Sequence, residues 1–294
     1  MQQQSRLATW LGAAAGAVSV LLLFAAVGHA SDRQANVTEE FHQVYQLSAE
    51  GRVELENING PVHITSWDRN EVKVDAIKRA WSKERVDEAK IEISSRPDFL
   101  SIRTEYPGHD TTFWSDRHDN PASVEYTLVV PRRARLDEIK LVNGSLDIQD
   151  VSGEVRASCV NGRLQARNLG GRTDLDTVNG ELDASMSRLP SSSLELSAVN
   201  GTLRLTLPSD AKAELEANTV SGGISNDFGL PVSRQFVGHR LRGELGGGGT
   251  HVKLSNVNGR IEIMHANDNR PLSPAKNLER EHSRDDDDDD DAEI

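Results

Sequence analysis

The chain has 294 residues, a formal net charge of −13 and a single cysteine, Cys159. One cysteine excludes an intramolecular disulfide and a cysteine-rich zinc site. The body is mildly acidic with mixed signs, which excludes the basic stripe of nucleic-acid-binding proteins and the polybasic patch that binds anionic lipids.

The N-terminus has the pattern of a secretory leader. Residues 7–28 are strongly apolar, Arg6 precedes them, and Gly28 and Ala30 place small residues at positions −3 and −1 of a cleavage site. We expect a signal peptide over 1–30, cleaved after Ala30, and a periplasmic or secreted protein. The alternative is an uncleaved anchor, because 22 apolar residues can span a bilayer; a membrane would be a partner only in that case.

Residues 31–135 predict an N-terminal β region with one short helix, continuous with the repeats that follow. Alternating apolar positions predict strands near 90–95, 99–105 and 124–130. The only helical pattern covers 82–90, where Ser82 is a suitable N-cap.

The segment 106–121 breaks the strand pattern, and it is either a binding loop or a solvated one. His109, Asp116 and His118 are weak candidates for metal ligands, since their spacing matches no established motif. Phe113 and Trp114 could stack on a sugar or anchor a partner; alternatively they pack over the end of the core.

Glycine recurs at every ninth residue between Gly144 and Gly180. Positions two and four after each glycine are apolar in nine cases of ten, and the positions between them are polar. This alternation is typical of a strand with one wet face. Cys159 falls in an inward column, so a buried thiol is a simpler reading than a reactive one.

Two all-β folds share this pattern. One is a β-solenoid with about 18 residues per coil, built from two nine-residue strand-turn units; the other is an antiparallel meander or sandwich with Asn-Gly hairpins. The seventh column (Val151, Val160, Leu169 and Val178) favours the solenoid, because a coil can turn these side chains inward at a corner whereas a hairpin would expose them.

The repeat region covers 136–266, and an early copy of its turn occurs near residue 60. We expect glycine and asparagine to form the turns because both tolerate positive φ. The turn residues are Asn59, Gly60, Asn143, Gly144, Gly153, Asn161, Gly162, Gly171, Asn179, Gly180, Asn200, Gly201, Asn258 and Gly259. The segment 226–250 lacks the pattern and predicts a flexible excursion that could bind a ligand.

Residues 267–294 have no core-forming pattern and predict a disordered acidic tail. It ends in the aspartate run Asp285–Asp291. The run lacks the glycine-shaped loop of an EF-hand, so a solubilising role is favoured over calcium binding.

No catalytic motif occurs, and the arginines that interleave with outward carboxylates indicate a charge-balanced wet face. We therefore expect no catalytic residue, no cofactor and no enzyme activity.

The order of these motifs resembles a bacterial family of β-strand-repeat domains of unknown function labelled "putative adhesin". The likeness covers about 40–265, from Glu56-Asn57-Ile58-Asn59-Gly60-Pro61-Val62-His63-Ile64 through Leu128-Val129-Val130-Pro131 and the serial Val-Asn-Gly turns to Val257-Asn258-Gly259-Arg260-Ile261. The resemblance implies an exported β-solenoid-like domain and brings no catalytic residues.

Three functions follow as hypotheses. The first is an exported, non-catalytic β-repeat protein that acts as an adhesin-like, surface-binding or scaffold module for a protein or glycan of the cell envelope or the exterior. The second is an extracytoplasmic carbohydrate-active enzyme on a β-helix. The third is an envelope-stress or regulatory partner protein.

Overall fold

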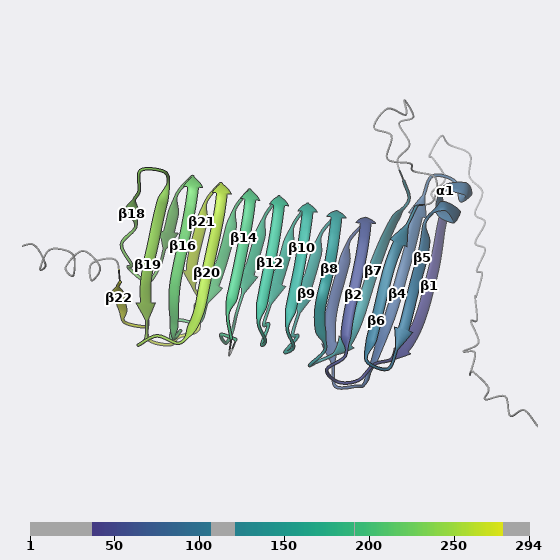
Figure 1. The fold of residues 1–294 in the computed structure, drawn as a ribbon, viewed down its shortest axis with the longest axis horizontal. Helices are drawn as coiled ribbons and strands as arrows, with labels where there is room; N and C mark the ends of the chain where they lie inside the picture. Colours follow the sequence, from purple (N-terminus) through teal and green to yellow (C-terminus); the bar gives the residue numbers. More distant parts are fainter. Residues whose placement is uncertain (1–36, 107–120, 191, 279–294) are drawn as a thin grey trace, which may run out of the picture. The chain divides into compact units, whose positions relative to one another are not determined.

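The computed structural model describes residues 37–106, 121–190 and 192–278. The regular secondary structure of these ranges is β-strand apart from one helix, α1 (Lys83–Glu88), as Figure 1 shows. Ser82 caps it, since its Oγ accepts a hydrogen bond from Arg85 N at 3.4 Å. No helix in these ranges is long and apolar enough to cross a bilayer.

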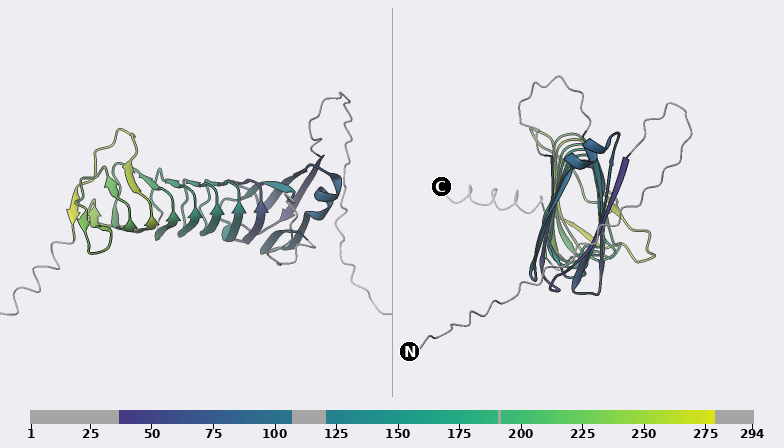
Figure 2. Two further views of the ribbon diagram at one scale, coloured as in Figure 1. Left: turned by 90° about the horizontal axis from the view of Figure 1, so that it is seen from above. Right: turned by 90° about the vertical axis from the view of Figure 1, so that its right-hand side faces the viewer.

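The described strands form two sheets that face each other (Figure 2). Sheet A runs in the order β1 (Val37–Gln46), β4 (Glu71–Ala80), β7 (Ser123–Pro131), β3 (Val62–Trp67), β9 (Leu146–Gln149), β11 (Leu164–Arg167), β13 (Leu182–Ser185), β15 (Leu203–Leu207), β21 (Ile261–His265), β17 (Ile224–Asn226). Sheet B runs β18 (Ser233–Arg234), β19 (His239–Leu245), β16 (Ala213–Ser221), β20 (Thr250–Asn258), β14 (Leu194–Asn200), β12 (Thr173–Asn179), β10 (Val155–Asn161), β8 (Arg135–Asn143), β2 (Arg52–Asn59), β6 (Phe99–Glu105), β5 (Lys90–Arg96), and β22 (Ala275–Asn277) pairs with β19.

The central strands pair in parallel, which confirms the solenoid and excludes the meander there. In sheet B, Ala157 of β10 lies opposite Leu175 of β12, and in sheet A, Leu164 of β11 lies opposite Leu182 of β13. Both pairs are 18 residues apart, so one coil consists of one strand from each sheet and two turns.

The coils are not stacked in chain order at either end. The pair β6/β7 lies outside β2/β3, although it follows β2/β3 in sequence. At the other end, β20/β21 is inserted between β14/β15 and β16/β17. Antiparallel strands finish both sheets at the N-terminal end (β1 and β4 in sheet A, β5 in sheet B) and sheet B at the other end (β18, β19 and β22), whereas sheet A ends there in β17, which pairs in parallel with β21. Such caps cover open coil edges, which would otherwise pair with other chains.

The core is the narrow space between the sheets. Every residue in the two columns expected to face inward is at most 3% exposed, including Val155, Leu164 and Ala166. A fully buried aliphatic side chain contributes about 1.5–3 kcal/mol to folding. Cys159 is also buried, and burial raises the pKa of its thiol to about 11. The side chain is therefore protonated at neutral pH and lacks the reactive thiolate.

The Val-Asn-Gly turns stack directly on one another along one edge. The glycine φ angles are between 114° and 151° from Gly60 to Gly259. A Cβ added to Gly162 would lie 1.7 Å from the carbonyl oxygen of Gly144, one coil away. Glycine is therefore required twice, by its backbone conformation and by the close approach of the next coil.

The asparagines of these turns do not adopt positive φ, so tolerance of positive φ is not the reason for asparagine at this position. Their side chains instead form a ladder in which each Nδ2 donates to the Oδ1 of the preceding coil at 2.9–3.1 Å. We call this the asparagine ladder; it joins Asn258, Asn200, Asn179, Asn161, Asn143 and Asn59.

The opposite edge uses different chemistry. Asp150 and Asn168 adopt positive φ there, at 58° and 54°. Gly153 and Gly171 are needed for space instead, since a Cβ on Gly171 would lie 2.3 Å from the carbonyl oxygen of Gly153. The nine-residue glycine spacing therefore arises from two unlike turns that alternate along the coil.

Two segments are more ordered than their sequences predict. The segment 226–250 contains β18 and β19 rather than a flexible excursion, and β19 pairs with both β16 and β22. Residues 275–277 form β22, and Ser273 is buried with its Oγ donating to Ala211 O at 2.6 Å. The body therefore extends to Leu278, whereas the expected disordered tail begins at residue 267.

Candidate functional site

An exposed aliphatic row follows the Val-Asn-Gly edge on the outer face of sheet B. It consists of the residue before each Asn-Gly or Ser-Gly pair on seven neighbouring strands, and its members are 37–53% exposed. We call it the valine row; in strand order it is Ile58, Val142, Val160, Val178, Val199, Val257 and Val220.

The valine row corrects the expectation for the seventh column. Val151 and Leu169 turn inward as expected and are at most 1% exposed, but Val160 and Val178 point outward. The reason is strand alternation: Cys159 is the last inward residue of β10, so the next side chain must face solvent. The coil therefore exposes aliphatic side chains of the seventh column, although their expected exposure in a hairpin is what favoured the solenoid.

At its C-terminal end the valine row becomes the floor of a groove of about 450 Å³. The segment that leads into β19 forms the wall, through Gln235, Val237, His239 and Arg240. We call this the valine groove; its aliphatic floor is Val178, Val199, Val220 and Val257.

A tight turn beside the valine groove presents two apolar side chains to solvent. Gln235 N donates to Gly238 O at 3.1 Å, which closes the turn. Phe236 at its tip is fully exposed, and Val237 is 62% exposed. A fully exposed phenylalanine is costly in water, and this one lies between Gln235 and Val237, which line the groove.

Polar side chains also line the groove, and some of them are unsatisfied. Burial raises the pKa of Asp176, with a further increase from the nearby Asp174 carboxylate. Arg240 pairs with Glu216 at 3.1 Å through Nη2, but its buried Nε has no hydrogen-bond partner in the described chain, and neither does His239 Nδ1. Two donors or acceptors are therefore free at the wall.

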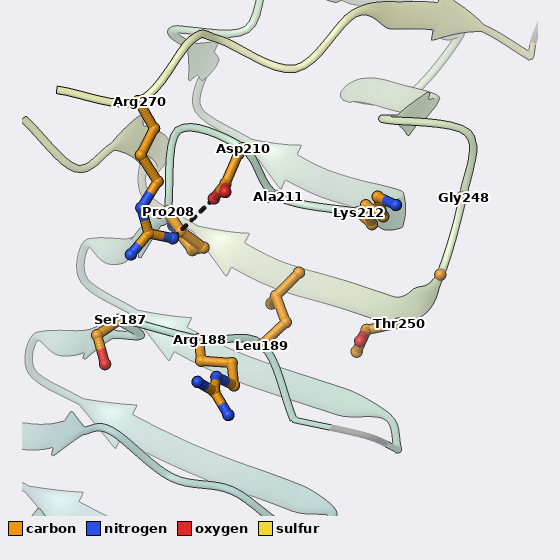
Figure 3. Close-up of a pocket in the computed structure, with 11 residues that line it drawn as sticks. Ser187, Arg188, Leu189, Pro208, Asp210, Ala211, Lys212, Gly248, Thr250 and Arg270 are labelled. Atoms are coloured by element: carbon orange, nitrogen blue, oxygen red, sulfur yellow. Dashed lines mark hydrogen bonds and ion pairs between the residues drawn. The ribbon is translucent and has the colours of Figure 1, made fainter. Parts of the chain in front are cut away.

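A second hollow, of about 720 Å³, lies on the opposite edge (Figure 3). Turns from three coil connections and the segment after β21 supply its lining. We call it the basic pocket, because Arg188, Lys212 and Arg270 line it with only one carboxylate, Asp210.

Only one of the three cations in the basic pocket is neutralised nearby. Arg270 donates to Asp210 at 2.8 Å and lies 3.5 Å from Asp268. Arg188 and Lys212 are exposed and form no ion pair with any residue that the structure describes. The pocket therefore has an excess of positive charge in an acidic protein.

The structure does not describe the segment from which the sequence predicts metal ligands and binding-loop aromatics. His109, Asp116, His118, Phe113 and Trp114 all fall outside the described residues. Within the described ranges, no group of three histidine, cysteine or acidic side chains is arranged to hold a metal. The predicted turn residues form the two stacked edges and bring together no chemical site.

Residues 137–264 match the model of a protein family described as Toastrack DUF4097. The match begins in β8 and ends in β21, and it includes every coil with a central Val-Asn-Gly turn. Residues 137–264 are therefore similar to Toastrack domains. This confirms the resemblance drawn from the serial turns.

Solved structures with a similar chain path include a "putative cell adhesion protein" from Clostridium sporogenes ATCC 15579. It is 12% identical, with a TM-score of 0.49, over 78% of this chain and 100% of that one. A "putative adhesin" from Bacteroides fragilis NCTC 9343 is 10% identical, with a TM-score of 0.30, over 78% and 97%. At TM-scores below 0.5 neither neighbour carries an argument about function. No curated protein shows significant sequence similarity to the chain.

The valine groove lies within the matched residues 137–264, whereas the basic pocket extends past them to Arg270. The family description names no activity. The segment 226–250, which the sequence offers as a possible binding segment, supplies the wall of the valine groove and Gly248, Gly249 and Thr250 of the basic pocket. Sequence reasoning missed the valine row and the cations of the basic pocket, although one signal for the row was present: the valine before each Asn-Gly is an odd number of residues from the last inward position.

Proposed function

We propose that the protein is an exported, non-catalytic β-repeat module that binds an extended apolar segment of a partner protein in the valine groove. One observation carries the proposal: seven aliphatic side chains form a continuous exposed row that ends in a groove beside the fully exposed Phe236. Soluble monomers rarely expose such continuous apolar surface unless it binds something.

The construction of the row supports a binding role rather than a packing defect. Strands in a sheet are about 4.8 Å apart, so the row presents methyl groups at a fixed spacing on a backbone that the asparagine ladder holds. A rigid surface loses little conformational entropy on binding, which favours affinity. The apolar leader and the Toastrack match support an envelope or surface location.

The first test removes the apolar character without touching the core. Val199→Asp and Val257→Asp change exposed positions, so the fold should persist, with a circular dichroism spectrum like that of the unchanged protein. The matched control is Val44→Asp on β1, where the valine is 52% exposed and far from the groove in strand order. We expect binding of anilinonaphthalene sulfonate to fall several-fold in the first two variants only.

The second test identifies the occupant. A photo-crosslinking amino acid at position 199 should capture one discrete envelope protein in the native host, and the peptide captured should be apolar and extended. The same group at position 44 should not capture it. Equal capture from both positions, or loss of dye binding in the Val44 control, would contradict the proposal.

A carbohydrate-active enzyme is a second candidate, and one observation favours it. Asp176, whose pKa is raised, shares the outer face of β12 with Asp174 next to the groove, and glycoside hydrolysis needs two placed carboxyl groups. Assays against a panel of acidic and neutral polysaccharides test it. Turnover that Asp176→Asn abolishes would establish an enzyme and displace the binding proposal.

A further inference from the structure

The basic pocket has no role in the valine-groove proposal, and its charge is unusual for this protein. Most arginines of the described body are ion-paired, as Arg156, Arg163 and Arg204 show. Arg188 and Lys212 are unpaired among the described residues, and both line one hollow from different turns (Figure 3). Unpaired cations around one hollow are groups that carboxylates and other oxyanions recognise.

We propose that the basic pocket binds a cluster of carboxylates and that its occupant is the aspartate run Asp285–Asp291 of the same chain. The residues after Leu278 contain ten acidic and two arginine residues, the densest negative charge of the sequence. Arg188 and Lys212 supply the free positive charge, and Arg270 lies beside them with its charge shared between two carboxylates.

The path of the chain places this run within reach. Ser273 contacts the wall of the pocket, because its Oγ donates to the carbonyl oxygen of Ala211, a lining residue. Leu278 is five residues further along, so it lies at most about 18 Å from Ser273. Asp285 follows Leu278 by seven residues, which can span about 23–25 Å. The run can therefore return to the pocket.

Attachment in the same chain makes weak charge pairs sufficient. Exposed ion pairs contribute little singly, but a short linker raises the effective concentration of the run at the pocket to the order of millimolar. Seven consecutive aspartates also give many equivalent ways to pair with two cations. Screening by salt should release the run, because the contacts are exposed.

Zero-length carbodiimide crosslinking tests the assignment on the full chain, since it joins a carboxylate to an adjacent lysine amine. We expect crosslinks between Lys212 and the aspartate run, identified by mass spectrometry. Lys253 is the matched control: it is exposed and forms no ion pair in the described chain. In the strand register of sheet B, Lys253 lies opposite Glu216, and Glu216 lies opposite Arg242. The backbone carbonyl of Arg242 accepts a hydrogen bond from Leu278 N, at the start of the tail. Proximity to the start of the tail alone would therefore favour Lys253.

The proposal expects several-fold more crosslinking to Lys212 than to Lys253, and loss of that excess in 1 M salt. Arg188→Ala should reduce the Lys212 crosslink several-fold, whereas Arg234→Ala, which removes another exposed arginine, should not. Equal labelling of the two lysines, or an Arg188→Ala yield like that of the unchanged chain, would overturn it.

Two further arms separate the sources of carboxylate. In a mixture of isotope-labelled and unlabelled protein, crosslinks between two peptides that carry the same label support the assignment. Crosslinks between a labelled and an unlabelled peptide would assign the occupant to a second copy instead. In the chain with Asp285–Asp291 all changed to Asn, a uronic acid polymer should bind more tightly than to the unchanged chain. Equal polymer binding by both chains would show that the run does not occupy the pocket. Because none of these readouts involves the valine groove, they can fail without affecting the proposed function.

Discussion

The two edges of the solenoid connect its two sheets through different kinds of turn. At the Val-Asn-Gly edge each turn repeats the one before it, with glycine carbonyls against glycine Cα atoms and a continuous asparagine ladder. At the opposite edge the connections vary in length, and the basic pocket forms where three of them meet. Regular stacking leaves no room for a ligand within an edge, so the hollows occur where the repeat changes.

The largest effect should come from filling the tightest contact of the regular edge. Gly162→Ala places a methyl group 1.7 Å from a backbone oxygen and forces alanine to φ 147°. We expect a loss of about 3–5 kcal/mol in unfolding free energy, because neither neighbour can move without disturbing the next coil. Urea unfolding measures it.

Gly223→Ala is the control for that experiment. Gly223 follows a turn glycine directly, yet nothing lies within 4 Å of an added Cβ. Its unfolding free energy should stay within about 1 kcal/mol of the unchanged protein. If Gly162→Ala matched it, the close stacking of the turns would be contradicted.

The opposite edge should tolerate the equivalent change better. Gly171→Ala meets the carbonyl oxygen of Gly153 at 2.3 Å but needs no positive φ. We expect a loss of about 2–3 kcal/mol, smaller than at Gly162 because only the steric term remains. Denaturant titration of the two variants side by side decides this, and the reverse order would show that space rather than φ dominates at both edges.

Each asparagine of the ladder should contribute less to the unfolding free energy than the turn glycines do, and its contribution should depend on its position in the ladder. Asn179 donates to Asn161 and accepts from Asn200, so Asn179→Ala breaks two side-chain hydrogen bonds. We expect a loss of about 1–2 kcal/mol. Asn258→Ala, at the end of the ladder, breaks one such bond and should cost about half as much. Thermal and chemical unfolding measure both losses, and equal losses for the two variants would show that the number of ladder bonds broken does not set the cost.

The smallest expected effect concerns charge on the outer face. Because burial and Asp174 raise the pKa of Asp176, its ionisation disfavours the folded state as pH rises through that pKa. Asp176→Asn should therefore stabilise the protein at neutral pH, by less than about 1 kcal/mol given solvent screening. The gain should vanish below about pH 4, where the carboxyl is protonated in both states. A gain that persists at pH 3 would contradict this cause.

Much of the fold follows from the sequence because the inward columns are strictly periodic. Leu164, Leu182 and their equivalents fix the strand faces, and the 18-residue spacing fixes the coil. Ser82 similarly marks the start of α1. These features depend on local chemistry, which a single sequence records.

The surfaces could not be predicted in the same way, since they depend on which coils become neighbours. Val220 joins the valine row only because β16 pairs with β20, and Arg270 reaches Asp210 from 60 residues away. The inward orientation expected for Val160 is wrong for another reason. Successive residues of a strand face opposite sides, so the residue after the inward Cys159 faces solvent even at a corner.

The inserted coil has a consequence for the folding of a chain that emerges N-terminus first, as during export. When residues 213–226 emerge, the pair β16/β17 has no partner, because its place beside β14/β15 belongs to β20/β21. The C-terminal coils can therefore close only after residues 250–265 have emerged. The emerging chain exposes an unpaired strand edge until then, which slows folding and creates a demand for chaperones that an array stacked in chain order would avoid.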